Sequence, residues 1–435
     1  MEEEEQKRVT SYYGVVTMLR TRRGLPLMDR LGRLRIVKPL AWFMLFLMPI
    51  SAAIIFYVLI RELLLYLSPQ GAAVAVAVRT VAPQANLLLP GLNPFIPVVY
   101  GIIGIVVAVT IHEFSHGIVA RSLGLRVKSV GVIFLVVIPI GAFVEVDEKE
   151  LRDTKARNSL RVLGAGTGIN LIVGLACLAL LIFSVSAMTP AADGAVVTCS
   201  DNCAASGFNL PSPAYAHGIV PGDVITAING IPFNDLDVAL RQSGDFQPGQ
   251  VVNITIWRNG QTLVVDDVTL GNVTVTTTNL ITNVSTTSFY PYLGVGSISY
   301  GTLKSNVESY ANAYRNDPAL YILPPSFPVL GNYNPASYIP FSDLLIGYYH
   351  LPLGTATSAV DNTLFWIFFV DFNLAIFNSL PLSITDGGQA LDRFLVGVGR
   401  GRITNERASR ISNVVGFLVF VLIIVVVAGP YLRLF

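Results

Sequence analysis

The 435-residue sequence predicts a polytopic α-helical membrane protein with about five transmembrane helices and a strand-rich insert. Hydrophobic residues make up 52% of the chain and charged residues only 13%, whereas a typical soluble domain has about 25% charged residues. Five apolar runs approach or exceed the roughly 20 residues that a helix needs to cross a bilayer. Between the third and fourth runs, residues 189–362 change to alternating Val, Ile and Thr with turns such as Asn259-Gly260, a pattern typical of strands.

The five expected spans have cores near residues 40–60, 96–119, 162–187, 364–387 and 411–430. A shorter apolar run, 129–144, contains Pro139 and Gly141 and is rich in Val and Ile. It therefore predicts a membrane-associated β-hairpin or a re-entrant segment. No cleavable signal peptide is expected, because 38 mostly polar residues precede the first apolar run.

The distribution of lysine and arginine predicts the orientation. Residues 1–38 hold nine, 121–161 hold eight and 389–410 hold five, but the long segment 189–362 holds only four. Under the positive-inside rule the first three segments are cytoplasmic, so the N-terminus lies in the cytoplasm and 189–362 lies outside. We expect a multi-pass protein of the cell membrane, in contact with the lipid bilayer. The net charge of +1 gives no reason to expect nucleic acid as a partner.

The second expected span carries the sequence HEFSH at residues 112–116. In a helix, His112 and His116 are one turn apart and project from the same face, so both imidazoles can bind one metal ion. Glu113 is one residue further on and can take a proton from a metal-activated water without being a ligand. The alternative is two polar residues at a helix interface, but ionisable groups inside a span are costly and by default functional.

A catalytic zinc ion needs a third protein ligand and an open fourth position. The strongest candidate is Asp386, in FNSLPLSITDGGQALD, expected near the inner end of the fourth helix after a break at Pro381. His112, Asp386 and Asn170 lie about 12, 10 and 14 Å from the cytoplasmic ends of their expected helices. A shared site explains this common depth. A solvated carboxylate or a helix cap is the alternative for Asp386.

Asn170 stands in GAGTGIN, where Gly164, Gly166 and Gly168 allow close approach of helices. Its amide is suited to holding the substrate backbone or stabilising an oxyanion. It is equally suited to a hydrogen bond between helices. The sequence leaves both roles open.

Part of the outer segment resembles a PDZ domain, in SPAYAHGIVPGDVITAINGIPF (212–233) and VVNITIWRNGQTLVV (251–265). The matching pieces are a small-residue helix before Gly218, the Gly222-Asp223 turn, a strand at 224–228 and the turn at Asn229-Gly230. The resemblance implies an inserted extracytoplasmic PDZ-like α/β domain that binds an extended peptide or a substrate tail at a sheet edge. A β-rich spacer that binds nothing is the alternative.

The sequence thus predicts seven segments and leaves the oligomeric state open. They are a cytoplasmic N-terminal segment (1–38), a first transmembrane helix (39–67), a transmembrane core with the HEFSH helix, the hairpin and the Asn170 helix (95–188), the PDZ-like domain (189–300), an extracytoplasmic cap of unassigned role (301–361), a transmembrane helix with Asp386 (362–392), and a cytoplasmic loop with the last transmembrane helix (393–435). Cys199 and Cys203 fall on the outer side, where either a disulfide or two free thiols are consistent with the spacing.

Taken together, these motifs resemble those of the site-2 protease family of intramembrane zinc metalloproteases. HEFSH (112–116) fits its His-Glu-x-x-His helix, GTGIN (166–170) its Gly-x-x-x-Asn helix and NSLPLSITDGG (378–388) its Asn-Pro-x-Pro…Leu-Asp-Gly helix. The similarity covers about residues 96–300 and 362–392. Ser379, Thr385 and Thr167 replace residues usual in the family, but none of these changes removes a chemical group.

The resemblance implies a zinc metalloendopeptidase in which His112, His116 and Asp386 bind Zn²⁺. Glu113 would be the general base and Asn170 a further catalytic residue. The implied substrates are transmembrane proteins cut within the bilayer during regulated intramembrane proteolysis, with the hairpin near 130–145 offering them a strand edge.

A membrane metal transporter and a catalytically inactive PDZ-bearing adaptor are the alternatives. The common depth of the polar groups argues against a transporter. Glu113, which zinc binding does not require, argues against an inactive adaptor.

Overall fold

The computed structural model describes residues 9–12, 16–79, 83–87, 89–93, 96–135, 138–201, 212–233, 235–258, 260–278, 285–316, 318–321, 341, 346–399 and 401–435. The chain divides into two compact units. The first, the membrane unit, contains residues 1–181, 317–333 and 359–435. The second, the insert unit, contains residues 182–316 and 334–358.

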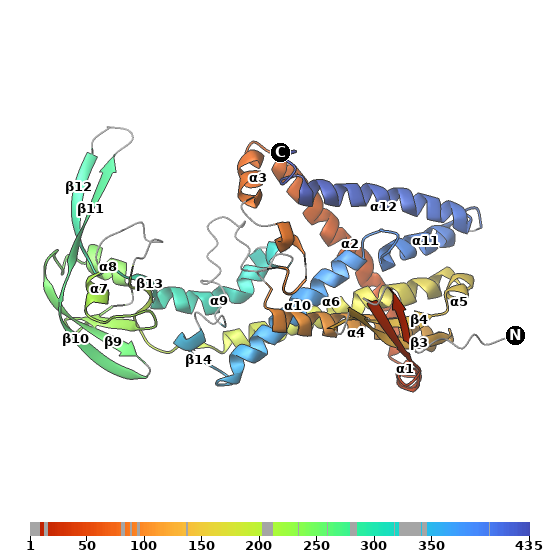
Figure 1. The fold of residues 1–435 in the computed structure, drawn as a ribbon, viewed down its shortest axis with the longest axis horizontal. Helices are drawn as coiled ribbons and strands as arrows, with labels where there is room; N and C mark the ends of the chain where they lie inside the picture. Colours follow the sequence, from red (N-terminus) through yellow and green to blue (C-terminus); the bar gives the residue numbers. More distant parts are fainter. Residues whose placement is uncertain are drawn as a thin grey trace. The chain divides into compact units, whose positions relative to one another are not determined.

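Five helices of the described chain are long and apolar enough to cross a membrane, which confirms the predicted number (Figure 1). They are α2 (Val37–Tyr66), α4 (Val98–Ser122), α6 (Ala156–Ser186), α10 (Ala356–Asn378) and α12 (Asn405–Ala428). Large apolar side chains on them are exposed, among them Phe46 at 63% and Phe417 at 65%. Outward-facing side chains of this kind are expected where lipid replaces water.

The fourth span differs from its prediction. The sequence predicted a span core at 364–387 with a break at Pro381, but in the structure α10 ends at Asn378 and a separate helix, α11 (Asp386–Val398), begins at Asp386. Pro381 has no backbone N–H to continue the helix, and the chain turns through Leu382 to Thr385. The Thr385 hydroxyl then accepts a hydrogen bond from the N–H of Gly388 and caps the new helix. Asp386 therefore lies at the start of a helix and not inside a span.

The predicted hairpin forms as β3 (Val127–Leu135) and β4 (Ile138–Val146), an antiparallel pair. It belongs to a larger sheet, because β1 (Val9–Tyr12) and β2 (Val16–Thr21) extend it in the order β1-β2-β3-β4. The sequence did not predict these N-terminal strands. Since β4 ends the order, one of its edges has no strand partner among the described residues, and this strand packs against α4.

Shorter helices complete the membrane unit: α1 (Leu25–Gly32), α3 (Gly71–Arg79), α5 (Glu148–Asp153) and the 3₁₀ turns η1 (Pro83–Asn86) and η3 (Pro318–Tyr321). The helix α11 packs side by side with α12 (Figure 1). A buried core joins α1, α2, α4, the hairpin and α6 through Met28, Met44, Val119, Val130 and Ala165. This core sets α4, α6 and β4 against one another and so positions the residues discussed below.

The insert unit is built on a sheet in the order β10-β9-β7-β6-β13, with β8 paired to β7. Its strands are β6 (Ala195–Cys199), β7 (Val224–Ile228), β8 (Ile231–Pro232), β9 (Val251–Arg258), β10 (Gln261–Thr269) and β13 (Gly296–Ser299). The helices are α7 (Pro213–Ala216), α8 (Leu236–Arg241) and α9 (Tyr300–Asn316). Further pairs are β11 (Gly271–Thr278) with β12 (Ser285–Tyr292) and β5 (Thr189–Pro190) with β14 (Tyr349–His350), which follows the turn η5 (Ile346–Tyr348).

Several local predictions for the insert hold. The strand predicted at 224–228 is β7, and Asn229 and Gly230 both have positive φ, as a tight hairpin turn requires. Asp223 is buried and paired with Arg258, whose pKa is raised by hydrogen bonding to that carboxylate. Cys199 is disulfide-bonded, while Cys203 and most of the predicted cap beyond α9 lie outside the described residues.

Candidate metal centre

The two histidines of HEFSH lie on α4 and are both buried, at 5% and 9% exposure. The Nδ1 atom of His116 lies 2.7 Å from the carbonyl oxygen of Val162 on α6. A carbonyl only accepts, so in the neutral imidazole Nδ1 carries the proton and Nε2 keeps its lone pair. His116 is thus oriented by α6 with Nε2 available as a metal ligand.

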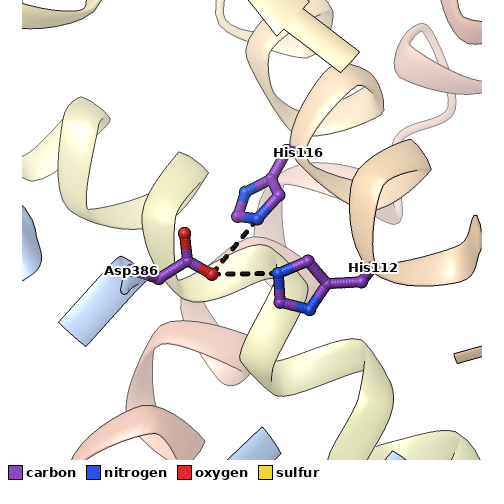
Figure 2. Close-up of side chains that lie close together, drawn as sticks. All are labelled: His112, His116 and Asp386. Atoms are coloured by element: carbon purple, nitrogen blue, oxygen red, sulfur yellow. Dashed lines mark ion pairs between the residues drawn. The ribbon is translucent and has the colours of Figure 1, made fainter. Parts of the chain in front are cut away.

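Asp386 completes the group from the start of α11 (Figure 2). Its Oδ2 atom lies 3.0 Å from Nε2 of His112 and 3.3 Å from Nε2 of His116. One ligand atom from each of the three residues lies within 4.8 Å of the others. Two imidazole nitrogens and one carboxylate oxygen are a donor set that zinc uses in catalytic sites with a fourth position left open. The residues present therefore fit zinc.

Gly166 on α6 makes room for this group. A Cβ atom at this position would collide with Nε2 of His116 and with the imidazole of His112. The sequence predicted only that the glycines of this helix permit close helix approach. The structure gives Gly166 a more specific role, since any side chain here would enter the space between the two imidazoles.

The chain around Asp386 is packed just as closely. A Cβ atom at Gly388 would collide with the backbone carbonyl of Leu382, so α11 can fold back against the preceding turn only with glycine there. The hydroxyl of Ser412 on α12 donates to the carbonyl of Gly388 at 3.2 Å. These contacts hold the start of α11, and with it Asp386, in place.

Glu113 is half-buried and points toward the hairpin. Its Oε2 atom accepts a hydrogen bond of 2.9 Å from the backbone N–H of Val144 on β4. That N–H lies on the edge of β4 beside which the described part of the chain places no strand. The sequence could not reveal this contact, because it joins residues 31 positions apart.

Asn170 is completely buried on α6, one turn from Gly166. Within the described part of the chain neither its Oδ1 nor its Nδ2 atom has a hydrogen-bond partner. The interhelical hydrogen bond, one of its two expected roles, is therefore not found among the described residues. His217 and His350, the remaining histidines, belong to the insert unit and are exposed.

Comparison with known proteins agrees with this geometry. The chain is 29% identical over 254 residues to an uncharacterised protein of Methanocaldococcus jannaschii, covering 58% of this chain and 62% of that protein. It is 25% identical over 240 residues to the zinc metalloprotease RasP of Shouchella clausii, covering 55% and 53%. It is also 27% identical over 157 residues to a membrane-bound transcription factor site-2 protease homolog of Arabidopsis thaliana, covering 36% and 28%.

The chain thus spans about half to three fifths of the length of the first two relatives. A sequence model of peptidase family M50 matches residues 100–423, which include both histidines, Glu113, Asn170 and Asp386. This match covers well over half of the chain, and the chain therefore belongs to peptidase family M50.

Proposed function

We propose that this multi-pass membrane protein is a zinc-dependent intramembrane endopeptidase that hydrolyses peptide bonds in transmembrane segments of other proteins. The observation that carries the proposal is the convergence of His112, His116 and Asp386 between apolar helices of the membrane unit. Ionisable side chains inside a membrane cost free energy, so a group of three of them indicates a function rather than a structural role.

His112, His116 and Asp386 would hold the ion. When bound, zinc supplies Lewis-acid polarisation and lowers the pKa of water at its open position to about 7. Glu113 would act as general base: its carboxylate takes a proton from the attacking water and passes it to the leaving amine. The hydrogen bond from Val144 N–H holds this carboxylate against β4. The uncommitted amide of Asn170 would stabilise the oxyanion or hold the substrate backbone.

The edge of β4 is suited to holding the scissile segment. A transmembrane helix satisfies its own backbone hydrogen bonds, so cleavage requires that it be unwound and given other partners. The free edge of β4 offers N–H and C=O groups in a row, and at Val144 this row meets Glu113. A substrate paired with β4 as an additional strand would therefore lie beside the general base.

We further propose that the insert unit is an extracytoplasmic PDZ-like domain that binds a peptide or substrate tail in regulated intramembrane proteolysis at the cell membrane. The lysine and arginine distribution supports the orientation, with N-terminus and 389–410 in the cytoplasm. The five-stranded order with two short helices and a tight turn at Asn229-Gly230 supports the domain type.

The test is cleavage of a panel of single-span substrates by purified, reconstituted protein, with and without a zinc chelator. Glu113→Gln keeps the size of the side chain and should lose at least about 100-fold in rate with zinc content unchanged. Glu148→Gln, at an exposed position on α5, is the matched control and should retain full activity. Stoichiometric zinc without any cleavage would instead favour a transporter, to be followed by a metal-flux assay, or an inactive adaptor.

A further inference from the structure

A groove of about 710 Å³ in the membrane unit lies away from the metal centre. It is formed by the segment leading from α5 into α6, the C-terminal half of α11 and the first residue of α12. Its lining residues are Arg152, Asp153, Thr154, Lys155, Ala156, Arg157, Leu160, Arg393, Phe394, Val396, Gly397, Val398 and Asn405. Because α6 and α12 are both expected spans and both begin here, the groove lies where helices enter the membrane.

The charges of the groove are unbalanced. Four of its side chains are cationic, Arg152, Lys155, Arg157 and Arg393, and only Asp153 is acidic. Lys155 and Arg157 are exposed and form no ion pair within the described residues. Arg152 has an exposed partner, Glu148, at 3.7 Å, which screens it little. The N-terminal end of α6 adds further positive potential.

Arg393 lies deeper and donates to neutral oxygens only: the carbonyl of Thr154 at 3.2 Å and Oδ1 of Asn405 at 3.3 Å. Burial and the charge of Arg152 hold the pKa of Arg393 below its usual value, and the nearby carboxylates of Asp392 and Asp153 oppose this only in part. An anion bound between two neighbouring cations would relieve their mutual repulsion, so its binding there is electrostatically favourable. These two hydrogen bonds also connect α11 to the segment before α6 and to the start of α12, the three parts that form the groove.

Apolar surface continues directly from this cationic cluster. Phe394 and Val398 line the groove on α11 and are 53% and 63% exposed. Cations beside exposed apolar side chains at the end of spanning helices match an amphiphile whose head is anionic and whose tail is hydrocarbon. A soluble phosphate compound would leave the two apolar side chains uncovered.

We propose that this groove binds an anionic phospholipid, with the phosphate between Lys155, Arg157 and Arg393 and the acyl chains over Phe394 and Val398. The bound lipid joins the start of α6 to α11. Both helices also contribute to the metal centre, through Gly166 and Asp386, so the lipid stabilises the arrangement of the membrane unit. The proposal does not depend on the catalytic one, since it concerns binding alone.

The test uses full-length protein purified in a neutral detergent and stripped of lipid, to which phosphatidylglycerol or phosphatidylcholine is returned. The groove variant is Lys155→Gln/Arg157→Gln, and the matched control is Arg33→Gln/Arg35→Gln, which removes two exposed cations between α1 and α2. Native mass spectrometry gives the Kd for each lipid. Wild type and control should prefer phosphatidylglycerol, and the groove variant should lose about 10- to 30-fold in affinity for that lipid only.

Two further arms identify the occupant. Phe394→Ala should weaken binding of phosphatidylglycerol several-fold and leave binding of glycerol phosphate unchanged. If glycerol phosphate binds as tightly as the whole lipid, the groove is a site for a soluble phosphate compound and the proposal is wrong. Equal affinity of wild type for the two lipids, or an equal loss in the control variant, overturns it as well.

Discussion

Two aspartates 15 positions apart in the membrane unit, Asp371 and Asp386, are both withdrawn from solvent but are placed in opposite surroundings. The side chain of Asp386 is 14% exposed and lies within 3.3 Å of two imidazole nitrogens. Asp371 is completely buried in the middle of α10, next to Gly174 of α6, and within the described residues neither of its carboxyl oxygens has a hydrogen-bond partner. The two carboxyl groups are chemically identical, but only that of Asp386 contacts groups that could bind a metal ion with it.

The difference separates a buried carboxylate that could bind a metal ion from one that could not. Asp386 follows a break in the helix, where a capping threonine and two glycines pack the start of α11 against the preceding turn. Asp371 lies inside a continuous helix, and neither of its carboxyl oxygens has a hydrogen-bond partner among the described residues. Burying a carboxylate costs free energy, and at Asp386 the two imidazole nitrogens at 3.0 and 3.3 Å provide the partners that Asp371 lacks among the described residues.

The largest expected effect comes from removing the partnered carboxylate. Asp386→Ala should reduce bound zinc from about one per chain to a small fraction, and lower peptidase activity by at least about 100-fold. Metal analysis of the purified protein measures the first quantity. Asp371→Ala is the matched control and should keep its zinc. Full zinc content in Asp386→Ala would show that another group holds the metal.

A second large effect is expected at Gly166, which lies against His112 and His116. Gly166→Ala places a methyl group against both imidazoles and should weaken zinc binding by about 10- to 100-fold, measured by competition with a chelator. Gly174→Ala, whose Cβ would stand 3.3 Å from that of Asp371, is the parallel change at the unpartnered aspartate. It should leave zinc affinity unchanged. Equal effects of the two changes would mean that helix spacing, and not clearance for the ligands, is what the glycines provide.

A moderate effect of opposite sign is expected from Asp371→Leu. Replacing a buried group that lacks partners by an apolar side chain should stabilise the membrane unit by about 1–3 kcal/mol, seen as a higher midpoint of thermal unfolding. Zinc content and activity should stay the same. Loss of activity with zinc retained would give Asp371 a part in the reaction and break the comparison with Asp386.

The smallest effect concerns a third aspartate, at the surface. The backbone N–H of Glu150 and the ammonium of Lys128 hold the pKa of Asp147 below its usual value. Because the folded pKa is lowered, the resulting stabilisation is present above about pH 4 and is lost as the pH falls below it. Asp147→Asn keeps the capping oxygen but not the charge, so its unfolding midpoint should be slightly lower than that of wild type at pH 7, and this difference should shrink as the pH falls through the lowered pKa of Asp147. A difference that persists at low pH would assign the effect to the cap.

Much of the site could be predicted because its chemistry is local in sequence. The i, i+4 spacing of His112 and His116 needs only a helix, and α4 is a helix over this whole stretch. The five spans and the hairpin follow from run length and from Val and Ile content. These features depend on neighbours within one or two turns of chain, which is the range over which sequence patterns are informative.

The rest depends on contacts between distant segments. The break at Pro381 was predicted, but the separate helix that begins at Asp386 was not, because its start depends on glycines that pack against the preceding turn. The strand β2 pairs with β3, more than a hundred residues away, and β1 in turn pairs with β2. The space that Gly166 leaves for the two imidazoles and the hydrogen bond from Val144 to Glu113 depend on how α6 and β4 pack against α4, which the sequence alone does not give.

The position of Asp386 after the insert has a consequence for the cohesion of the chain. His112 and His116 precede the insert unit in sequence and Asp386 follows it, so a metal held by all three is a cross-link that closes a loop containing the whole insert. Closing a long loop removes conformational entropy from the unfolded chain, and a metal bound only in the folded state adds its binding free energy to folding. The ion would thus stabilise the membrane unit, whose sequence is interrupted by the insert unit. A chelator should therefore lower the stability of the membrane unit, while the insert unit, which has its own core, stays folded.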